Sequence, residues 1–96
     1  MELLQDLVEV FLEDLPGRLR ALRGALEQDD LDAVFEGAHV IKGSVSTFAA
    51  AAAYEAASQL EDLARRGEDD GLKAATDVLE REISRLQPAL REILKS

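Results

Sequence analysis

Residues 31–48 read LDAVFEGAHVIKGSVSTF, and their apolar positions predict a helix with one buried face. Intervals of three and four residues dominate the spacing of Leu31, Val34, Phe35, Ala38, Ile41, Val45 and Phe48. Because this spacing follows the α-helical period, these side chains form a stripe that should face a core. His39, Lys42, Gly43 and Ser46 fall on the adjoining face.

Residues on the N-terminal side of this helix predict a first helix and a short turn. Leucine-rich positions recur at helical spacing over residues 2–28. Pro16-Gly17 should bend or break this first helix, since proline disturbs the hydrogen bonding of a helix interior. Gln28-Asp29-Asp30 forms a polar break, and an aspartate there should cap the helix that starts at residue 31.

The C-terminal half predicts two more helices. Ser46-Thr47 offers side-chain oxygens that could cap a third helix, which should stop near the basic residue and glycine of Arg66-Gly67. Its expected inward residues are Ala50, Ala53, Tyr54, Ala57, Leu60, Leu63 and Ala64. A last helix starts near residue 72, and Pro88 predicts a kink or an early end in it.

Composition agrees with an all-α fold. The 96 residues are rich in Ala, Leu and Glu, and only 4% are aromatic, which favours helices over sheet. Short polar turns between amphipathic helices favour opposite directions for neighbours, so we expect an antiparallel up-and-down four-helix bundle with a bent or broken N-terminal helix. The length fits one domain over residues 1–96.

Charge and composition also argue against several classes of function. The formal net charge of −9 disfavours binding to nucleic acid or to anionic membranes, because both attract clusters of Lys and Arg. The chain has no cysteine, and therefore no disulfide or thiolate site. We find no secretory signal and no apolar run long enough to cross a bilayer, so a cytoplasmic location is expected.

His39 is the residue with the clearest chemical potential. It is the only histidine, and Glu36 one turn earlier adds at most one ligand, so a metal site is not expected. One His and one Lys on a helix face also do not make an acid–base site or a hydrolase triad. A neutral imidazole is, however, a competent nucleophile toward phosphorus, and the Lys42 ammonium, expected in solvent, would offset the charge of a bound phosphoryl group.

Gly43 supports a role for the imidazole beyond that of a half-buried polar residue. Glycine in a helix interior costs roughly 1 kcal/mol relative to alanine, and free approach of a partner to His39 would account for that cost. Ser44 and Ser46 could bond to phosphoryl oxygens, although hydrogen bonds that finish the helix are the simpler role for both.

The segment His39-x-x-Lys42-Gly43-Ser44 resembles the signature of histidine-containing phosphotransfer (HPt) domains. The mid-helix Pro16, the Asp29-Asp30 break and Leu60-Glu61 are similar to that family as well. Ala49 departs from it, since many members have glycine there, which affects the local turn rather than the chemistry.

This resemblance implies a four-helix phosphoryl carrier without kinase activity of its own. His39, through Nε2 by analogy, would accept a phosphoryl group from a receiver-domain phospho-aspartate or from a sensor histidine kinase and pass it to another response-regulator receiver domain. No cofactor is expected on this chain, because Mg²⁺ should be brought by the receiver. Partners are expected to dock around Gly43 in a small, transient interface. Glu36, Val40, Ser44 and Ser46 are the other expected docking residues.

Two alternatives remain at the level of sequence. One is a phosphate-independent helical interaction or dimerisation module in which His39 is incidental. The other is the phosphorylatable domain of a larger chemotaxis-type kinase, which shares the chemistry and differs in donor and domain context.

Overall fold

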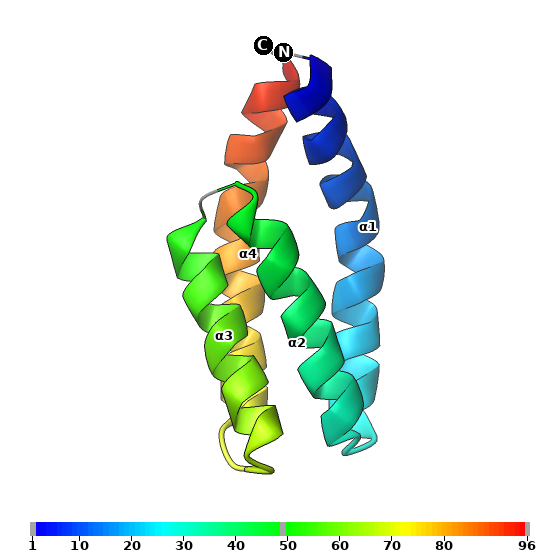
Figure 1. Ribbon diagram of the computed structural model, residues 1–96, viewed down its shortest axis with the longest axis vertical. Helices are drawn as coiled ribbons and strands as arrows, with labels where there is room; N and C mark the ends of the chain where they lie inside the picture. Colours follow the sequence, from blue (N-terminus) through cyan, green and yellow to red (C-terminus); the bar gives the residue numbers. More distant parts are fainter. Residues whose placement is uncertain (1, 49, 96) are drawn as a thin grey trace.

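Four helices joined by short turns make up the computed structural model, which describes residues 2–48 and 50–95 (Figure 1). The helices are α1 (Glu2–Glu27), α2 (Leu31–Ser46), α3 (Ala51–Arg65) and α4 (Leu72–Lys95). Each helix packs against its neighbours in the chain, and α4 closes the ring against α1. The all-α four-helix bundle expected from the sequence is therefore confirmed. Within the described ranges, no helix is long and apolar enough to cross a membrane.

The first helix runs through its proline without a break. Pro16 lies inside α1, and Figure 1 shows the ribbon following a gently curved path. Leu15 and Leu22, on either side of the proline, are almost completely buried. Burial of these side chains holds both halves of the helix against the same core, so the alternative of two separate segments is wrong.

The turn between α1 and α2 uses its two aspartates differently. Asp29 adopts a left-handed conformation with φ 53°, and the Asp30 N–H donates to the Ala25 carbonyl at 3.0 Å, which closes the end of α1. The Asp30 carboxylate accepts from the Ala33 N–H at 3.1 Å and caps α2 as expected. Asp29 thus helps to end one helix through its backbone, and Asp30 begins the next through its side chain.

The predicted cap of α3 is wrong. The helix starts at Ala51 with Ala50 as its N-cap, and no side chain caps it. Ser46 and Thr47 instead complete α2, where the Ser46 hydroxyl donates to the Gly43 carbonyl at 2.8 Å. The end of α3 is as predicted, because Gly67 has φ 71° and lets the chain leave the helix.

The early end predicted for the last helix is also wrong. Pro88 lies inside α4, which continues to Lys95. Leu90 is buried, and Ile93 packs at the edge of the core. Apolar contacts beyond the proline therefore hold the final turns in place.

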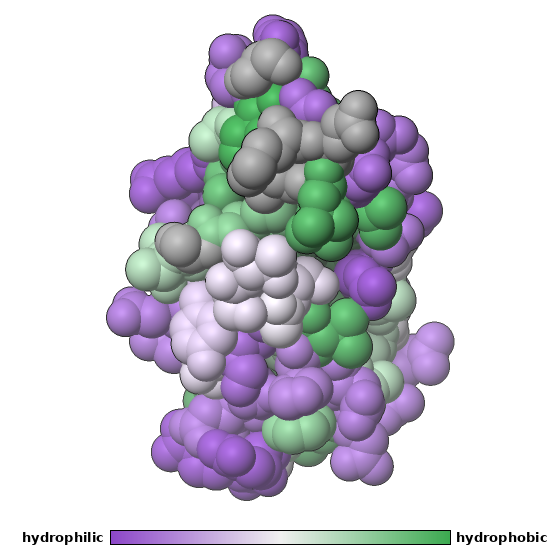
Figure 2. All heavy atoms as spheres, turned by 45° about the horizontal axis from the view of Figure 1, so that its top comes forward, coloured by the Kyte–Doolittle hydropathy of each residue, from purple (hydrophilic) through white to green (hydrophobic). Residues whose placement is uncertain are grey.

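The bundle is elongated and its helices differ in length. It measures 42 × 21 × 17 Å, and α1 and α4 extend beyond the shorter α2 and α3 at one end (Figure 1). Exposed apolar residues near that end include Leu3, Leu7 and Val10. Figure 2, with this end tipped forward, shows hydrophobic atoms mainly in the upper half and hydrophilic atoms over most of the lower end.

Candidate functional site

His39 lies on the outer face of α2 with its ring accessible. The side chain is 60% exposed, and its ring stacks on Phe35 one turn earlier, with centroids 6.0 Å apart and planes 7° from parallel. This separation of four residues places the two rings on the same side of the helix. The apolar stripe of α2 packs inward beside them, so the fold buries α2 without covering the imidazole.

A buried carboxylate from the next helix holds the imidazole. Glu61 on α3 is only 7% exposed, and its Oε2 lies 2.6 Å from His39 Nδ1. Because a carboxylate accepts hydrogen bonds, Nδ1 carries the proton in this contact, and in the neutral form of the ring Nε2 then presents its lone pair. The orientation that a nucleophilic Nε2 needs is thus supplied by a residue 22 positions away in the chain.

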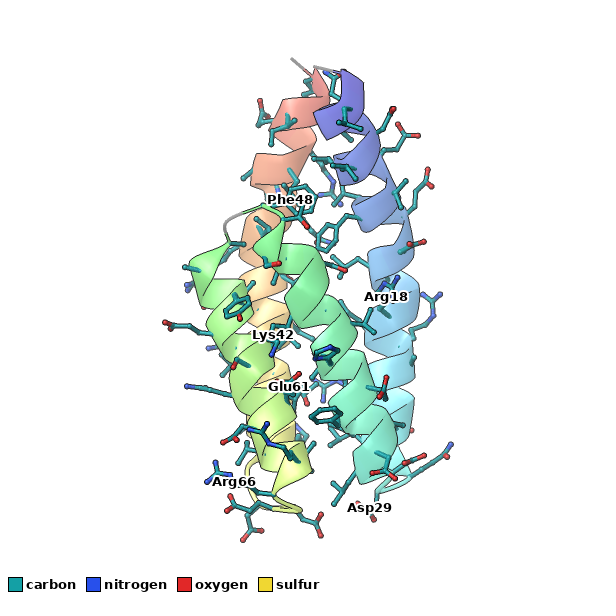
Figure 3. All side chains as sticks on the ribbon, in the orientation of Figure 1. Arg18, Asp29, Lys42, Phe48, Glu61 and Arg66 are labelled. Atoms are coloured by element: carbon teal, nitrogen blue, oxygen red, sulfur yellow. The ribbon has the colours of Figure 1, made fainter. Side chains whose placement is uncertain are left out.

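Lys42 does not lie free in solvent, contrary to expectation. Its Nζ donates to Glu61 Oε1 at 2.7 Å, and its side chain is 21% exposed. The ammonium also lies 5.9 Å from the centroid of the Tyr54 ring, a cation–π distance. Figure 3 shows Lys42 and Glu61 at mid-height, where α2 and α3 face each other.

Glu61 remains ionised because of these two partners. Burial raises the pKa of its carboxyl, but hydrogen bonds from Lys42 and His39 and their charge outweigh burial and leave the pKa below its ordinary value of 4.5. The site therefore holds a buried negative charge between an ammonium and an imidazole.

Gly43 leaves the surface beside the imidazole open. A Cβ built at this glycine would meet nothing within 4 Å, so the residue is not required by packing inside the bundle. Glu36 and Val40 are exposed on the same helix, as expected for docking residues. Both serine hydroxyls bond within α2, Ser44 to the Val40 carbonyl at 3.1 Å and Ser46 to that of Gly43.

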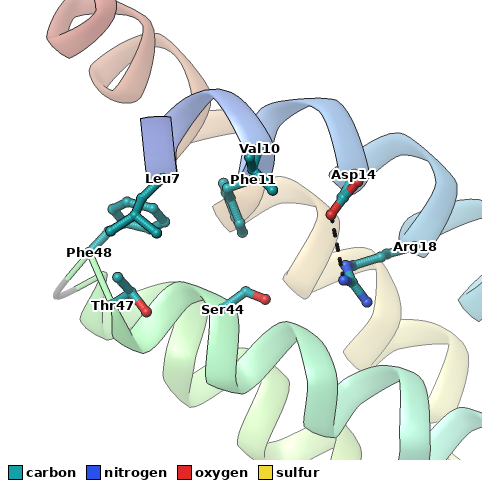
Figure 4. A pocket seen from close by; sticks show the side chains of 8 residues that line it. All are labelled: Leu7, Val10, Phe11, Asp14, Arg18, Ser44, Thr47 and Phe48. Carbon is teal, nitrogen blue, oxygen red and sulfur yellow. Dashed lines mark ion pairs between the residues drawn. The ribbon is translucent and has the colours of Figure 1, made fainter. Parts of the chain in front are cut away.

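Two shallow hollows lie between α1 and α2 on the α1 side of this face. One is lined by Arg18, Ala21, Ala33, Glu36, Gly37 and Val40. The other lies farther toward the C-terminal end of α2 and is lined by Leu7, Val10, Phe11, Asp14, Arg18, Ser44, Thr47 and Phe48 (Figure 4). Arg18, paired with Asp14 at 3.7 Å, borders both hollows.

No set of three or more His, Asp or Glu side chains that could hold an ion occurs in residues 2–48 and 50–95. Glu61 already has its two oxygens engaged by Lys42 and His39. What the arrangement offers is an oriented, exposed nucleophilic nitrogen with a cation one turn away.

Comparison with known proteins agrees with this geometry. The model of the Hpt domain family matches residues 6–89, and the chain belongs to this family. Hpt domains are phosphoryl-carrier modules of two-component phosphorelays, where they work with kinase and receiver partners. The function of this chain is accordingly histidine phosphotransfer.

A solved structure of the same class superposes closely. The crystal structure of histidine-containing phosphotransfer protein B (HptB) from Pseudomonas aeruginosa PAO1 matches with a TM-score of 0.90 and 31% sequence identity. The match covers 95% of this chain and 79% of that one. A search of curated proteins found no significant match.

Glu61 and Tyr54 were missed as functional candidates, although the sequence held a signal for one of them. Glu61 lies four residues after Ala57 and three before Ala64, so helical spacing places this carboxylate on the buried side. Tyr54 was expected to face inward, but it is 41% exposed and flanks Lys42 instead. The inter-helix contacts themselves depend on the register of α2 against α3.

Proposed function

We propose that His39 is the phosphoacceptor of this Hpt domain and that its Nε2 is the attacking atom. The contact that carries the proposal is the 2.6 Å bond from Nδ1 to the Glu61 carboxylate. Because Nδ1 holds the proton, the lone pair of Nε2 is available on the exposed side of the ring.

Lys42 is proposed to stabilise the phosphoryl group. The transferred group carries nearly two negative charges at neutral pH, and a residue three positions from His39 on a helix lies within reach of it. The ammonium is already held beside the imidazole through their shared partner, Glu61. Little reorganisation of α2 is therefore needed to bring the charge to the phosphoryl oxygens.

The receiver partner is proposed to supply Mg²⁺. In-line phosphoryl transfer needs charge neutralisation around the phosphorus, and an ion beside the donor or acceptor carboxylate meets that need. The absence of a three-carboxylate cluster in the described ranges is consistent with this division of labour. We also propose that the chain is a carrier without kinase activity of its own and that it works in the cytoplasm, where receivers and kinases meet.

Docking is proposed over Gly43 and the two hollows between α1 and α2. A receiver whose carboxylate reaches His39 must also cover the adjacent surface of α2, including Glu36 and Val40. The second hollow, which shares Arg18 with the first, lies beside Leu7 and Val10, which are about half exposed. Apolar surface next to an open reactive side chain fits a short-lived interface, whose partner leaves after each transfer.

Phosphoryl exchange tests the proposal directly. Incubation with a receiver phosphorylated on its aspartate should give a label on this chain that is labile in acid and stable in alkali, as expected for phosphohistidine. His39→Gln should abolish the label while leaving the helical circular dichroism spectrum unchanged, because the ring is exposed. ATP alone, without a kinase, should give no label.

Three results would contradict the proposal. A label that persists in His39→Gln would move the phosphoacceptor elsewhere. An alkali-labile label would point to an acyl phosphate. Stable co-purification with a receiver, with no exchange of label, would favour a module that only binds.

A further inference from the structure

The imidazole of His39 has an aromatic contact as well as a polar one. Its ring lies beside that of Phe35 on the same helix, with centroids 6.0 Å apart and planes 7° from parallel. Phe35 is half-buried and packs against the core, which limits the freedom of its ring to move away. The histidine side chain is 60% exposed, so the stack lies at the border between the core and the solvent.

The electronic character of a phenyl ring makes this contact sensitive to the charge on the imidazole. The face of an aromatic ring carries negative potential, and a cation within about 6 Å of the ring centroid is attracted to it. A neutral imidazole gains only ordinary packing from such a contact. An imidazole with a phosphoryl group on one nitrogen and a proton on the other has a positively charged ring, and this ring gains the additional attraction.

Resting on the proposed role of His39, we propose that Phe35 stabilises the phosphorylated imidazole by a cation–π contact. Its ring thereby shifts the equilibrium of phosphoryl exchange toward the loaded chain. Phe35 contacts the ring that reacts, and it acts on the loaded state rather than on the docking of the receiver.

Loading changes the charge of the ring that Phe35 contacts. The Nε2 lone pair forms the N–P bond while the bond from phosphorus to the receiver's aspartyl oxygen breaks, and the electron pair of that bond leaves with the aspartate. The proton on Nδ1 stays in place, so the imidazole becomes an imidazolium stacked on the phenyl ring. When an aspartate of the next receiver takes the phosphoryl group, the electron pair returns to Nε2 and the positive charge disappears.

A purely structural role for Phe35 predicts a different result. Side-chain pairs four residues apart stabilise a helix, and Phe35 also packs against the core. Such contacts stabilise the loaded and unloaded chains equally, so they leave the exchange equilibrium unchanged. The equilibrium is also independent of docking affinity when little of either protein is in complex. The exchange equilibrium therefore separates a cation–π contact from packing and from docking.

The test measures the equilibrium ratio of phosphorylated chain to phosphorylated receiver, with a receiver whose phospho-aspartate hydrolyses slowly. Phe35→Leu keeps an apolar side chain against the core but removes the aromatic face. It should lower the ratio about threefold, the factor that corresponds to a cation–π contact at an exposed site. Phe35→Tyr keeps the aromatic face and should keep the parental ratio. Pentafluorophenylalanine at position 35 keeps the shape but reverses the polarity of the ring face, and it should lower the ratio at least as much as leucine.

Leu31→Ala provides a matched control on the same helix. Leu31 is also half-buried and packed against the core, but it lies about 12 Å along the helix from His39. Its substitution should lower the free energy of unfolding and leave the exchange ratio unchanged. Proton NMR of the unloaded parent tests the geometry separately, because the imidazole protons should show nuclear Overhauser contacts to the ring protons of Phe35.

Each outcome decides the inference. A lowered ratio with leucine and with pentafluorophenylalanine, and a parental ratio with tyrosine, support it. A parental ratio with leucine or with pentafluorophenylalanine, a lowered ratio with tyrosine, or an equal loss in Leu31→Ala would overturn it. Missing Overhauser contacts in the parent would do the same. If Phe35→Leu fails to fold, the pentafluorophenylalanine variant decides, because its shape is nearly that of the parent.

The inference and the proposed function can fail separately. Loss of label in His39→Gln together with a parental ratio in Phe35→Leu would reject the cation–π contact and leave the proposed function intact. A label that persists in His39→Gln would reject both.

Discussion

Gly43 is the residue whose substitution should most clearly raise stability while it impairs phosphoryl transfer. A side chain at this position has open space around it, and leucine is a better helix former than glycine by roughly 1 kcal/mol. Gly43→Leu should therefore raise the free energy of unfolding by about that amount while it obstructs a receiver, so that transfer slows strongly. Urea unfolding and a phosphoryl-exchange assay measure the two effects.

Gly24 provides the matched control for this substitution. It also lies inside a helix with nothing within 4 Å of an added Cβ, but on α1 rather than beside His39. Gly24→Leu should give a similar gain in stability with unchanged transfer. If both leucine variants transferred at the parental rate, the docking role of Gly43 would be wrong.

At the level of single residues, the sequence predicted which side chains share a helix face better than it predicted which side chains contact each other. The spacing on one helix placed His39, Lys42 and Gly43 on an accessible face, since this depends only on the helical period. The environment of Lys42 was not predictable in the same way. Its ammonium contacts Glu61 and approaches Tyr54, both on α3, and such contacts require the packing of two helices to be known.

Among the elements, the start of α2 should depend on one aspartate. Asp30 caps the helix through its carboxylate, whereas Asp29 only adopts the left-handed conformation that ends α1. Asp30→Ala should lower the free energy of unfolding by about 1 kcal/mol. Asp29→Gly removes the same charge and should be neutral or slightly stabilising, because glycine adopts positive φ without steric cost. Denaturant melts of the two variants test this difference, and equal losses would contradict the assigned roles.

Helix boundaries were predictable where a local signal acts alone. Asp30 and Gly67 mark ends that local hydrogen bonds and backbone freedom determine. Pro16 and Pro88 did not predict helix ends reliably. Both lie inside helices, because leucines are buried on both sides of Pro16 and beyond Pro88. The start of α3 could not be predicted from capping residues, since its N-cap is Ala50.

For the whole molecule, an ion-pair cluster joins the first and last helices. Arg23 on α1 donates to both Asp77 and Glu80 on α4, with its Nε 3.1 Å from Glu80. These hydrogen bonds raise the pKa of the guanidinium, which stays charged throughout. The bond from Arg23, followed by that from Lys73, lowers the pKa of Asp77 below its ordinary value of 3.8.

The cluster should make part of the stability depend on pH. A carboxyl whose pKa is lowered on folding contributes fully above its ordinary pKa and loses that contribution as pH falls through the folded value. Arg23→Gln should therefore lower Tm by a few degrees at pH 7, and the difference from the parent should shrink below about pH 3.8. Arg20→Gln, at an exposed position of the same helix, should change Tm little at either pH. A difference that grew in acid would contradict the assignment.

The unequal lengths of the helices determine where the protein can be attached to a surface without covering His39. The first turns of α1 and the last turns of α4 lie side by side, where the Gln5 amide donates to the Ile93 carbonyl at 3.4 Å. Arg18, level with the histidine face, is about 22 Å farther along α1 from Leu3. A tether attached at Lys95 would thus hold the molecule on a sensor chip by the end of α4, with the imidazole left accessible to receivers in solution.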